Sequence, residues 1–355
     1  MSSTQTSGSP PGGRGSRFLA SGKSLFTTHE EKHVARALDE GLERIEEGLR
    51  VELSHADDIV DSLARYLFDA GGKRVRPLLT LLTAQWGAGV NDRVVTAAQV
   101  IELTHLATLY HDDVMDEAAK RRGVPSAHSV WGNSMAILAG DLLFARAGAL
   151  GVLLGEDATR RQTETFERLV VGQMRETVGP REHEEPTDHY LRVLADKTGS
   201  LIALAAEFGI TQSGAPDEYV SAVRGFGEKI GVAFQLVDDV LDLSADEEAT
   251  GKKPGTDVRR GVVTLPVILL EGTAGQDHRD VELRDLLQRG ASGDLPEKDF
   301  SEAISRLRDH GVTEQTMEMA RSVADQAVEC LADLPTGVVR DALQRFAAQV
   351  VERTQ

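Results

Sequence analysis

Cysteine is almost absent from this sequence, since Cys330 is the only one among 355 residues. A lone cysteine excludes an intrachain disulfide framework and any zinc site built from several cysteines, and it suits the reducing cytoplasm, where we place the protein. Basic residues are outnumbered, with 39 Lys and Arg against 57 Asp and Glu and a formal net charge of -18. This balance argues against a nucleic-acid partner, which would need a basic face. No uninterrupted apolar run approaches the roughly 18 residues of a membrane span.

Aromatic residues make up only 5% of the chain, and helical periodicity dominates from about residue 29. Apolar residues recur at spacings of three and four, for example at Val34, Leu38 and Leu42. No segment alternates apolar and polar residues over the length of a strand, and no Gly/Ser-rich linker divides the interior. We therefore expect one large all-α domain over residues 29–355. Residues 1–28 are rich in Ser, Gly and Pro, which predicts a disordered tail.

Two acidic clusters with the same DDxxD spacing each follow an apolar stretch of helical periodicity. Their members are Asp112, Asp113, Asp116, Asp238, Asp239 and Asp242. Residues four apart share a helix face, where like charges repel, and carboxylates beside apolar runs are costly unless they meet a cation. One such cluster could be a solvated helix end, but two suggest a shared cation. Carboxylates without Cys or His suit Mg²⁺, which keeps further positions for water or phosphate oxygens. The clusters therefore predict a magnesium site for a phosphorylated ligand.

Basic segments that could meet the phosphate flank the clusters. Residues 71–77 place Lys73, Arg74 and Arg76 in a glycine-opened turn before a helix. Other basic loops contain Arg121, Arg122, Lys197, Lys252 and Lys253. Lys and Arg offer point charges and bidentate forks to phosphate oxygens, and a helix N-terminus adds its dipole. In a chain of net charge -18, these segments indicate a site that metal and cations neutralise locally.

Taken in order, these motifs resemble those of the trans-isoprenyl diphosphate synthases, the polyprenyl synthetase family, over about residues 30–350. The matching segments are 71–77 (GGKRVRP), His105, 111–116 (HDDVMD), 121–123 (RRG), 140–141 (GD), 197–198 (KT), 234–242 (FQLVDDVLD), 255–257 (GTD) and 264–266 (TLP). The resemblance implies a single bundle of long helices around a deep central cavity, usually assembled as a homodimer. This fold agrees with the all-α fold that the periodicity predicts.

The resemblance also implies a reaction. Isopentenyl diphosphate would condense head to tail with an allylic diphosphate, with about three Mg²⁺ ions beside the bound diphosphate. The six aspartates match metal-binding positions, and Asp112, Asp116 and Asp238 would be direct ligands. The residues matched to the isopentenyl diphosphate site are Lys73, Arg76, His105 and Arg122. Those matched to the allylic diphosphate site are Arg121, Lys197 and Lys252. Thr198 and Gln235 match polar positions near the developing allylic cation.

Product length depends in this family partly on the residue five positions before the first cluster, where a large aromatic stops chain growth. That residue is Ala107 here. We therefore expect a medium- or long-chain all-trans product, as in the bacterial enzymes that supply quinone side chains. A plug from another helix, such as Phe144 or Phe166, would favour a short farnesyl or geranylgeranyl product instead.

A class I terpene cyclase and a non-catalytic partner subunit are the other interpretations. A cyclase needs an aromatic-lined cavity and usually mixes Asn, Ser and Glu in its second metal site. The sparse aromatics and the second DDxxD argue against it, and the complete clusters argue against a non-catalytic subunit. Because no membrane span is expected, an apolar product would be released to a membrane or to an acceptor enzyme.

Overall fold

A computed structural model of the chain describes residues 29–244, 253–273 and 277–352. Regular structure within these residues is almost entirely helical, as the periodicity predicts. The elements of the first half are α2 (His29–Leu53), α3 (Asp58–Asp69), α4 (Val75–Thr83), the 3₁₀ turn η1 (Ala84–Trp86), α5 (Asp92–Met115), β1 (Lys120–Arg121), β2 (Val124–Pro125), α6 (Ala127–Trp131), α7 (Asn133–Leu153) and α8 (Glu156–Val178).

The second half continues with helices of similar length. Its elements are α9 (Pro186–Leu194), the π-helical turn η2 (Ala195–Gly199), α10 (Ser200–Ser213), the 3₁₀ turn η3 (Asp217–Tyr219), α11 (Val220–Leu243), α13 (Thr256–Arg259), α14 (Leu265–Thr273), α15 (His278–Ala291), α16 (Glu297–Arg308), α17 (Gly311–Cys330) and α18 (Val338–Glu352). The tail predicted for residues 1–28 lies outside the described residues, so its division from the helical domain stays a prediction.

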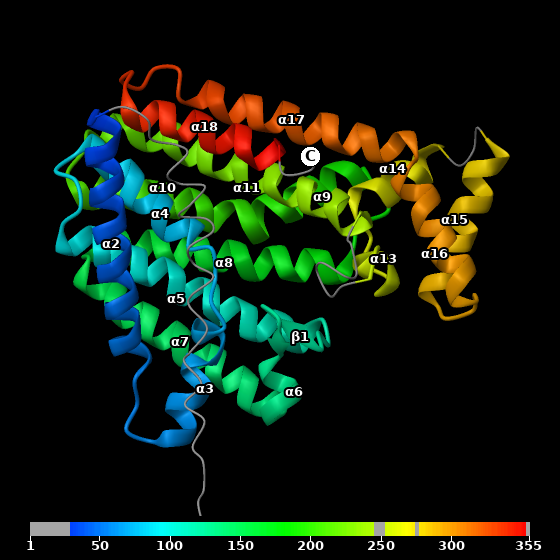
Figure 1. Cartoon of the computed structure of the whole chain (residues 1–355), viewed down its shortest axis with the longest axis horizontal. Helices are drawn as coiled ribbons and strands as arrows, with labels where there is room; N and C mark the ends of the chain where they lie inside the picture. The colour runs from blue at the N-terminus through cyan, green and yellow to red at the C-terminus, as the bar shows by residue number, and fades with distance from the viewer. Residues whose placement is uncertain (1–28, 245–252, 274–276, 353–355) are drawn as a thin grey trace, which may run out of the picture.

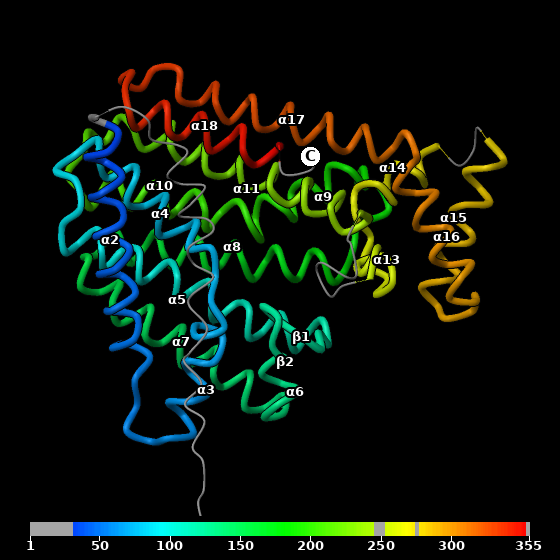
Figure 2. Tube along the Cα trace, viewed as in Figure 1, coloured from blue at the N-terminus to red at the C-terminus, as the bar shows by residue number. Residues whose placement is uncertain are grey.

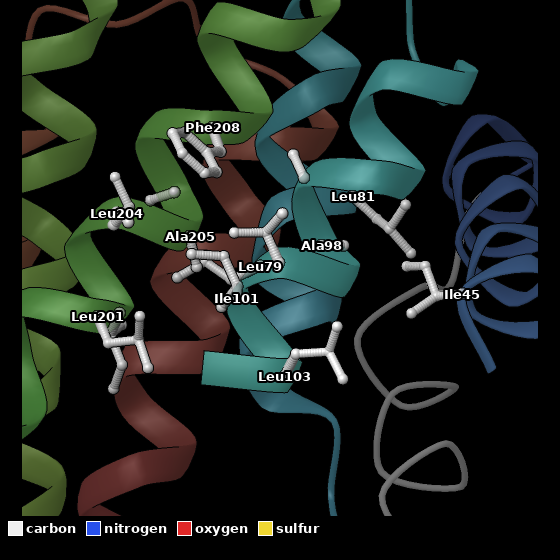
Figure 3. Packing of buried hydrophobic residues seen from close by; sticks show 14 of the residues in the cluster. Ile45, Leu79, Leu81, Ala98, Ile101, Leu103, Leu201, Leu204, Ala205 and Phe208 are labelled. Atoms are coloured by element: carbon white, nitrogen blue, oxygen red, sulfur yellow. The ribbon is translucent and has the colours of Figure 1, made fainter. Parts of the chain in front are cut away.

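Two helices, α5 and α10, form the centre of the bundle because they bury side chains on nearly all sides. A helix that is apolar all round must be enclosed by others. Figure 3 shows how residues of α2, α4, α5 and α10 pack together there. Those labelled are Ile45, Leu79, Leu81, Ala98, Ile101, Leu103, Leu201, Leu204, Ala205 and Phe208.

The long helices α5, α8, α11 and α17 run along the long axis of the molecule, and α2 crosses them at one end (Figure 1). The α15–α16 hairpin projects at the opposite end and has a small apolar core of its own around Phe300 and Leu307. The antiparallel ribbon of β1 and β2 follows the end of α5, as the trace in Figure 2 shows. The expected all-α fold of long helices is confirmed.

Helix α7 is the one described helix long and apolar enough to cross a membrane. Asp141 and Arg146 interrupt its apolar sequence, which agrees with the absence of a long uninterrupted run. One face of α7, with Ala136, Gly140 and Leu143, is buried in the bundle. The apolar stretch of α7 is 39% buried within the structure, so α7 packs against the bundle along one face only.

Candidate active site

The first aspartate cluster lies at the C-terminal end of α5. Asn91 starts this helix by accepting a hydrogen bond from the Val94 N–H at 2.9 Å, and Asp116 ends it. The three carboxylates have different surroundings, since Asp113 is fully buried, Asp112 partly buried and Asp116 exposed. Asp112 and Asp116 are therefore accessible on the outside of the helix end, while Asp113 faces the interior.

The β1–β2 ribbon covers Asp113. Arg121 pairs with Val124 in the ribbon, and its Nε donates to Asp113 Oδ1 at 2.6 Å. Arg122 has a left-handed backbone with φ of 53°, and its guanidinium donates to the Leu67 carbonyl at 2.6 Å. Side-chain-bearing residues rarely adopt this conformation, and such strain gathers at functional sites. Arg121 and Arg122, two of the three arginines that the resemblance assigns to diphosphates, thus each have a partner within the protein.

The π-helical turn η2 brings Lys197 and Thr198 to the same region. Lys197 Nζ donates to the carboxylate of Glu176 on α8 at 2.5 Å. Burial by itself lowers the pKa of Lys197, but Glu176 and the first cluster together raise it above its usual value. Burial raises the pKa of Asp112 to about 6, with Lys197 opposing that rise. Lys197 is therefore a fixed cation facing the first cluster.

The second cluster lies on the last turns of α11. Asp239 is buried and accepts a hydrogen bond from the Tyr190 hydroxyl of α9 at 2.6 Å. Burial raises the pKa of Asp239 to about 8. Asp242 accepts a hydrogen bond from the Asp257 N–H at 3.0 Å, and Asp238 is only partly buried. As in the first cluster, the second aspartate of the motif is the one that the protein encloses.

The two clusters lie at the same end of the bundle. The charge of Glu176 acts on Asp112 of the first cluster and on Tyr190 beside the second. Figure 1 shows α5 and α11 both ending on the side that faces away from α2. Gln235, three residues before Asp238, is partly buried on α11. The fold thus places both motifs at one end of the bundle, and a cation shared between them stays a prediction.

The loop after α11 is described only in part. Lys252, which the resemblance assigns to the allylic diphosphate, lies outside the described residues. Lys253 is within them and pairs with Glu297 of α16 at 3.3 Å. Gly255, with φ of 67°, donates its N–H to the Asp242 carbonyl at 2.8 Å. The loop is therefore tied by its backbone to the second cluster.

Magnesium fits these carboxylates if a ligand completes its coordination. Within residues 29–244, 253–273 and 277–352, no three His, Cys, Asp or Glu side chains lie close enough to hold a metal by themselves. Mg²⁺ is commonly bound by one or two carboxylates, with water and substrate phosphate oxygens in its other positions. Asp112 and Asp116, one turn apart, offer such a pair. The donor set is that of a metal bound together with a diphosphate.

A group of positive charges surrounds Glu102, one turn before His105 on α5. Glu102 is 2% exposed. Burial lowers the pKa of Arg76 and that of Arg122, the latter to about 10, and Glu102 opposes both shifts. Burial and the nearby arginines hold the pKa of His105 well below its usual value, so His105 is neutral at pH 7. Lys73 is exposed at the start of the same turn. Glu102 and Glu46 both pair with Arg74. These two carboxylates are set against Arg74, Arg76 and Arg122, so a diphosphate would find a net positive site.

Ala107 is fully buried on α5, one turn before His111. The His111 ring approaches Gly140 of α7 so closely that a Cβ there would lie 2.3 Å from its Nε2. The same ring meets Phe144 edge-on at 5.6 Å between centroids, and Phe144 meets Phe166 of α8 at 4.4 Å. An aromatic cluster therefore lies beside this part of α5. Both an open floor at Ala107 and a plug at Phe144 or Phe166 stay predictions.

Three residues of the site have no motif signal that the sequence reasoning used: Glu102, Glu176 and Tyr190. Arg74 lies in the basic turn at 71–77, but no separate role was predicted for it. Arg74 joins Glu102 at 3.0 Å and also pairs with Glu46. Glu102 gave one usable hint, because it is a lone carboxylate within an apolar run of α5. Glu176 and Tyr190 lie in ordinary amphipathic sequence, and only the packing of α8 and α9 shows their role.

Comparison with known proteins decides the family. A family model described as polyprenyl synthetase matches residues 57–303. The chain belongs to the polyprenyl synthetase family. It is 44% identical over 320 residues to the nonaprenyl diphosphate synthase of Mycobacterium tuberculosis, an alignment covering 90% of this chain and 94% of that protein.

Solved structures of polyprenyl synthetases agree with this assignment. A polyprenyl synthase from Caulobacter crescentus, complexed with calcium and isoprenyl diphosphate, superposes with a TM-score of 0.81 at 32% identity and covers 91% of this chain and 98% of its own. A geranylgeranyl pyrophosphate synthase from Corynebacterium glutamicum, in a complex of the same kind, gives a TM-score of 0.79 at 40% identity, covering 92% and 98%. The resemblance inferred from the motifs is confirmed, and the chain is a prenyltransferase of this family.

Proposed function

We propose that the chain condenses isopentenyl diphosphate head to tail with an allylic diphosphate, in a Mg²⁺-dependent reaction. The observation that carries the proposal is the meeting of both DDxxD clusters at one end of the bundle, with Lys197 facing the first of them. Bound Mg²⁺ supplies positive charge to the leaving diphosphate. Asp112, Asp116 and Asp238 would hold the metal, about three ions in all when diphosphate is bound.

The protein's own cations divide between the two substrates. Arg121, Lys197 and Lys252 would bind the allylic diphosphate, and the fixed charge of Lys197 would stabilise the charge that develops when the C–O bond ionises. Thr198 and Gln235 would face the allylic cation with their dipoles. The group around Glu102 would bind isopentenyl diphosphate through Lys73, Arg76, His105 and Arg122. A neutral His105 can donate a hydrogen bond to this substrate without adding charge. The departing diphosphate would take the proton lost from the condensed intermediate.

The reaction is tested with purified protein, Mg²⁺ and labelled isopentenyl diphosphate, combined separately with allylic primers of several lengths. Products are dephosphorylated and sized by chromatography and mass. We expect incorporation that stops when Mg²⁺ is chelated. No incorporation with any primer, together with cyclic hydrocarbon from the primer alone, would favour a terpene cyclase. Absence of Mg²⁺-dependent thermal stabilisation by inorganic pyrophosphate would favour a non-catalytic partner subunit.

We further propose a medium- or long-chain product, and the small side chain of Ala107 would leave room beside the first cluster for its growing tail. The variant Ala107→Phe should shorten the product while keeping the melting temperature near that of wild type. If no space adjoins Ala107, the added ring overpacks the core and should cost about 1–3 kcal/mol. A shortened product at unchanged stability supports the open floor, whereas an unchanged product at lowered stability places the floor elsewhere.

The assembly we propose is a homodimer formed through α7 and α8. Both helices expose large apolar side chains, which marks protein–protein surfaces: Ile137, Leu138, Val152, Leu153, Val170, Met174 and Val178. Leu138, 58% exposed, is a central position to change. Leu138→Glu should give a monomer by light scattering, whereas the control Val51→Glu on α2 should not. A monomeric wild type would contradict the dimer. A cytoplasmic location agrees with the single cysteine.

A further inference from the structure

Charges of both signs on α8 hold the π-helical turn that carries Lys197. Asp196, 7% exposed, accepts hydrogen bonds from Arg168 Nε at 2.9 Å and from the Arg175 guanidinium at 2.5 Å. The next residue, Lys197, donates to Glu176 of the same helix at 2.5 Å. Successive residues of the turn thus have oppositely charged partners on one helix, so the turn cannot rotate against α8 without breaking both sets of contacts.

The backbone of the turn also lies very close to α8. Gly172 lies between Arg168 and Arg175 in the sequence. A Cβ atom added at Gly172 would lie 2.9 Å from the Asp196 Cβ and 3.0 Å from the Lys197 backbone nitrogen. Only glycine allows this approach. Arg168, Gly172, Arg175 and Glu176 therefore form one stripe of α8 shaped and charged to fit the turn.

The opposite side of the turn is fixed by α11. A Cβ on Gly231 would lie 2.6 Å from the Gly199 Cα, so these two backbones touch. Arg168 donates to Glu228 of α11 at 2.7 Å as well as to Asp196. One guanidinium thus ties α8, the turn and α11 together.

A π-helical turn contains an extra residue relative to an α-helix and is rare without a functional reason. Relaxing it to an α-helix would turn the side chains that follow by about 100° per residue. We propose that Asp196 is a positioning residue: clamped by Arg168 and Arg175, it keeps the turn π-helical and so aims Lys197 and Thr198 at the allylic diphosphate. This inference rests on the roles proposed above for Lys197 and Thr198.

The same contacts would be present if Asp196 only stabilised the packing of the helices. A second buried carboxylate that pairs with arginines of α8 and α11 serves as a matched control for this possibility. Glu207 on α10 is 1% exposed and pairs with Arg161 of α8 and with Arg224 of α11, the latter at 3.2 Å. Glu207 thus links α10 to α8 and α11, as Asp196 and Arg168 link the turn to the same two helices. It lies eleven residues, or roughly 16 Å, further along the chain than Asp196. Removing its charge should affect stability and leave the turn intact.

The experiment compares Asp196→Asn, Glu207→Gln and Lys197→Ala, alone and as the two double variants with Lys197→Ala. Melting temperature, kcat, KM for each substrate and the affinity for inorganic pyrophosphate with Mg²⁺, by calorimetry, are measured for each. We expect both acid-to-amide variants to melt lower than wild type. Asp196→Asn should lower kcat by about tenfold to a hundredfold, the scale of a small misplacement of reacting groups. It should weaken pyrophosphate binding as Lys197→Ala does and leave KM for isopentenyl diphosphate unchanged.

The double variants separate positioning from stability. Asp196→Asn should slow the Lys197→Ala variant by less than it slows wild type, because the part of its effect that acts through the Lys197 side chain is then already lost and only the part through Thr198 remains. Should Asp196→Asn fold poorly, Arg175→Gln removes one of the two donors and should give the same pattern at smaller size. If Lys197→Ala is impaired while Asp196→Asn matches Glu207→Gln in kcat and pyrophosphate affinity, the inference fails alone. If Lys197→Ala behaves as wild type, the proposed role of Lys197 fails and the inference with it.

Discussion

The two aspartate clusters end helices of equal length, 24 residues each in α5 and α11, and share the DDxxD spacing. Each buries its second aspartate and leaves the first partly accessible. The buried carboxylates, however, have chemically different partners. Asp113 meets a guanidinium, Arg121, at 2.6 Å, and Asp239 meets a phenol, Tyr190, also at 2.6 Å.

The different partners of Asp113 and Asp239 show that the buried carboxylate of one motif can be stabilised either by an opposite charge or by a neutral hydrogen-bond donor. Burial raises the pKa of Asp113 as well, but the charge of Arg121, the other half of the ion pair, opposes that rise. A neutral hydroxyl cannot balance a charge, and burial raises the pKa of Asp239 to about 8, so Asp239 keeps a proton at neutral pH. The first cluster is thus balanced by charge and the second by a hydrogen bond and a proton.

The largest expected effect concerns the first aspartate of each cluster, which is the partly accessible one in both. Asp112→Ala and Asp238→Ala should each lower turnover by at least about a thousandfold, roughly 4 kcal/mol of transition-state stabilisation, through loss of metal ligation. Circular dichroism and melting temperature should stay near wild type, since both side chains are partly accessible. Steady-state kinetics across a Mg²⁺ titration tests this, and wild-type turnover in either folded variant would remove that cluster from the metal site.

The ion pair in the first cluster should dominate stability. Arg121→Gln leaves the Asp113 carboxylate buried without its countercharge, and breaking a buried pair in this way costs about 3–5 kcal/mol. Denaturant unfolding of the metal-free protein measures the loss. The double variant Arg121→Gln with Asp113→Asn should recover much of it, because the uncompensated charge is then gone. No recovery would show that Arg121 stabilises the ribbon by other contacts.

A smaller loss is expected at the second cluster. Tyr190→Phe removes one hydrogen bond to a carboxyl that can stay protonated, so about 1–3 kcal/mol should be lost. The comparison of Tyr190→Phe with Arg121→Gln under the same conditions is the direct test of the two modes. Equal losses, or a larger loss from Tyr190→Phe, would contradict the assignment of charge balance to the first cluster alone.

The sequence allowed the fold and the accessible half of the site to be predicted, because both depend on local patterns. Helical periodicity identified the bundle, and the DDxxD spacing led to the prediction that Asp112 and Asp238 bind one ligand, for which the fold places both clusters at the same end of the bundle. The partners Tyr190 and Glu176 depend on which helix packs against which, and no spacing encodes that. The exact repeat of the motif even concealed the difference between Asp113 and Asp239, since burial and partner identity are properties of the folded chain.

The smallest expected effect is a change in the free energy of unfolding with pH, which follows from the different partners of the two buried aspartates. The folded-state pKa of Asp239, about 8, lies above its unfolded value of roughly 3.9, so the folded protein holds a proton that the unfolded chain has lost. Asp239 therefore lowers the free energy of unfolding as pH rises from about 4 to 8, by at most roughly 1.4 kcal/mol per pH unit. Asp239→Asn keeps an acceptor for the Tyr190 hydroxyl and should remove this slope.

Urea unfolding of the metal-free protein at several pH values measures that slope. The stability of Asp239→Asn relative to wild type should increase from pH 5 to 8 and then level off. Asp309 is a suitable control, because hydrogen bonding to Arg308 holds its pKa below the usual range. It therefore adds stability that is lost only as pH falls below about 4. Asp309→Asn should run parallel to wild type above pH 5. A parallel course for Asp239→Asn as well would mean that Asp239 is ionised in the fold, so that both clusters would bury a charge.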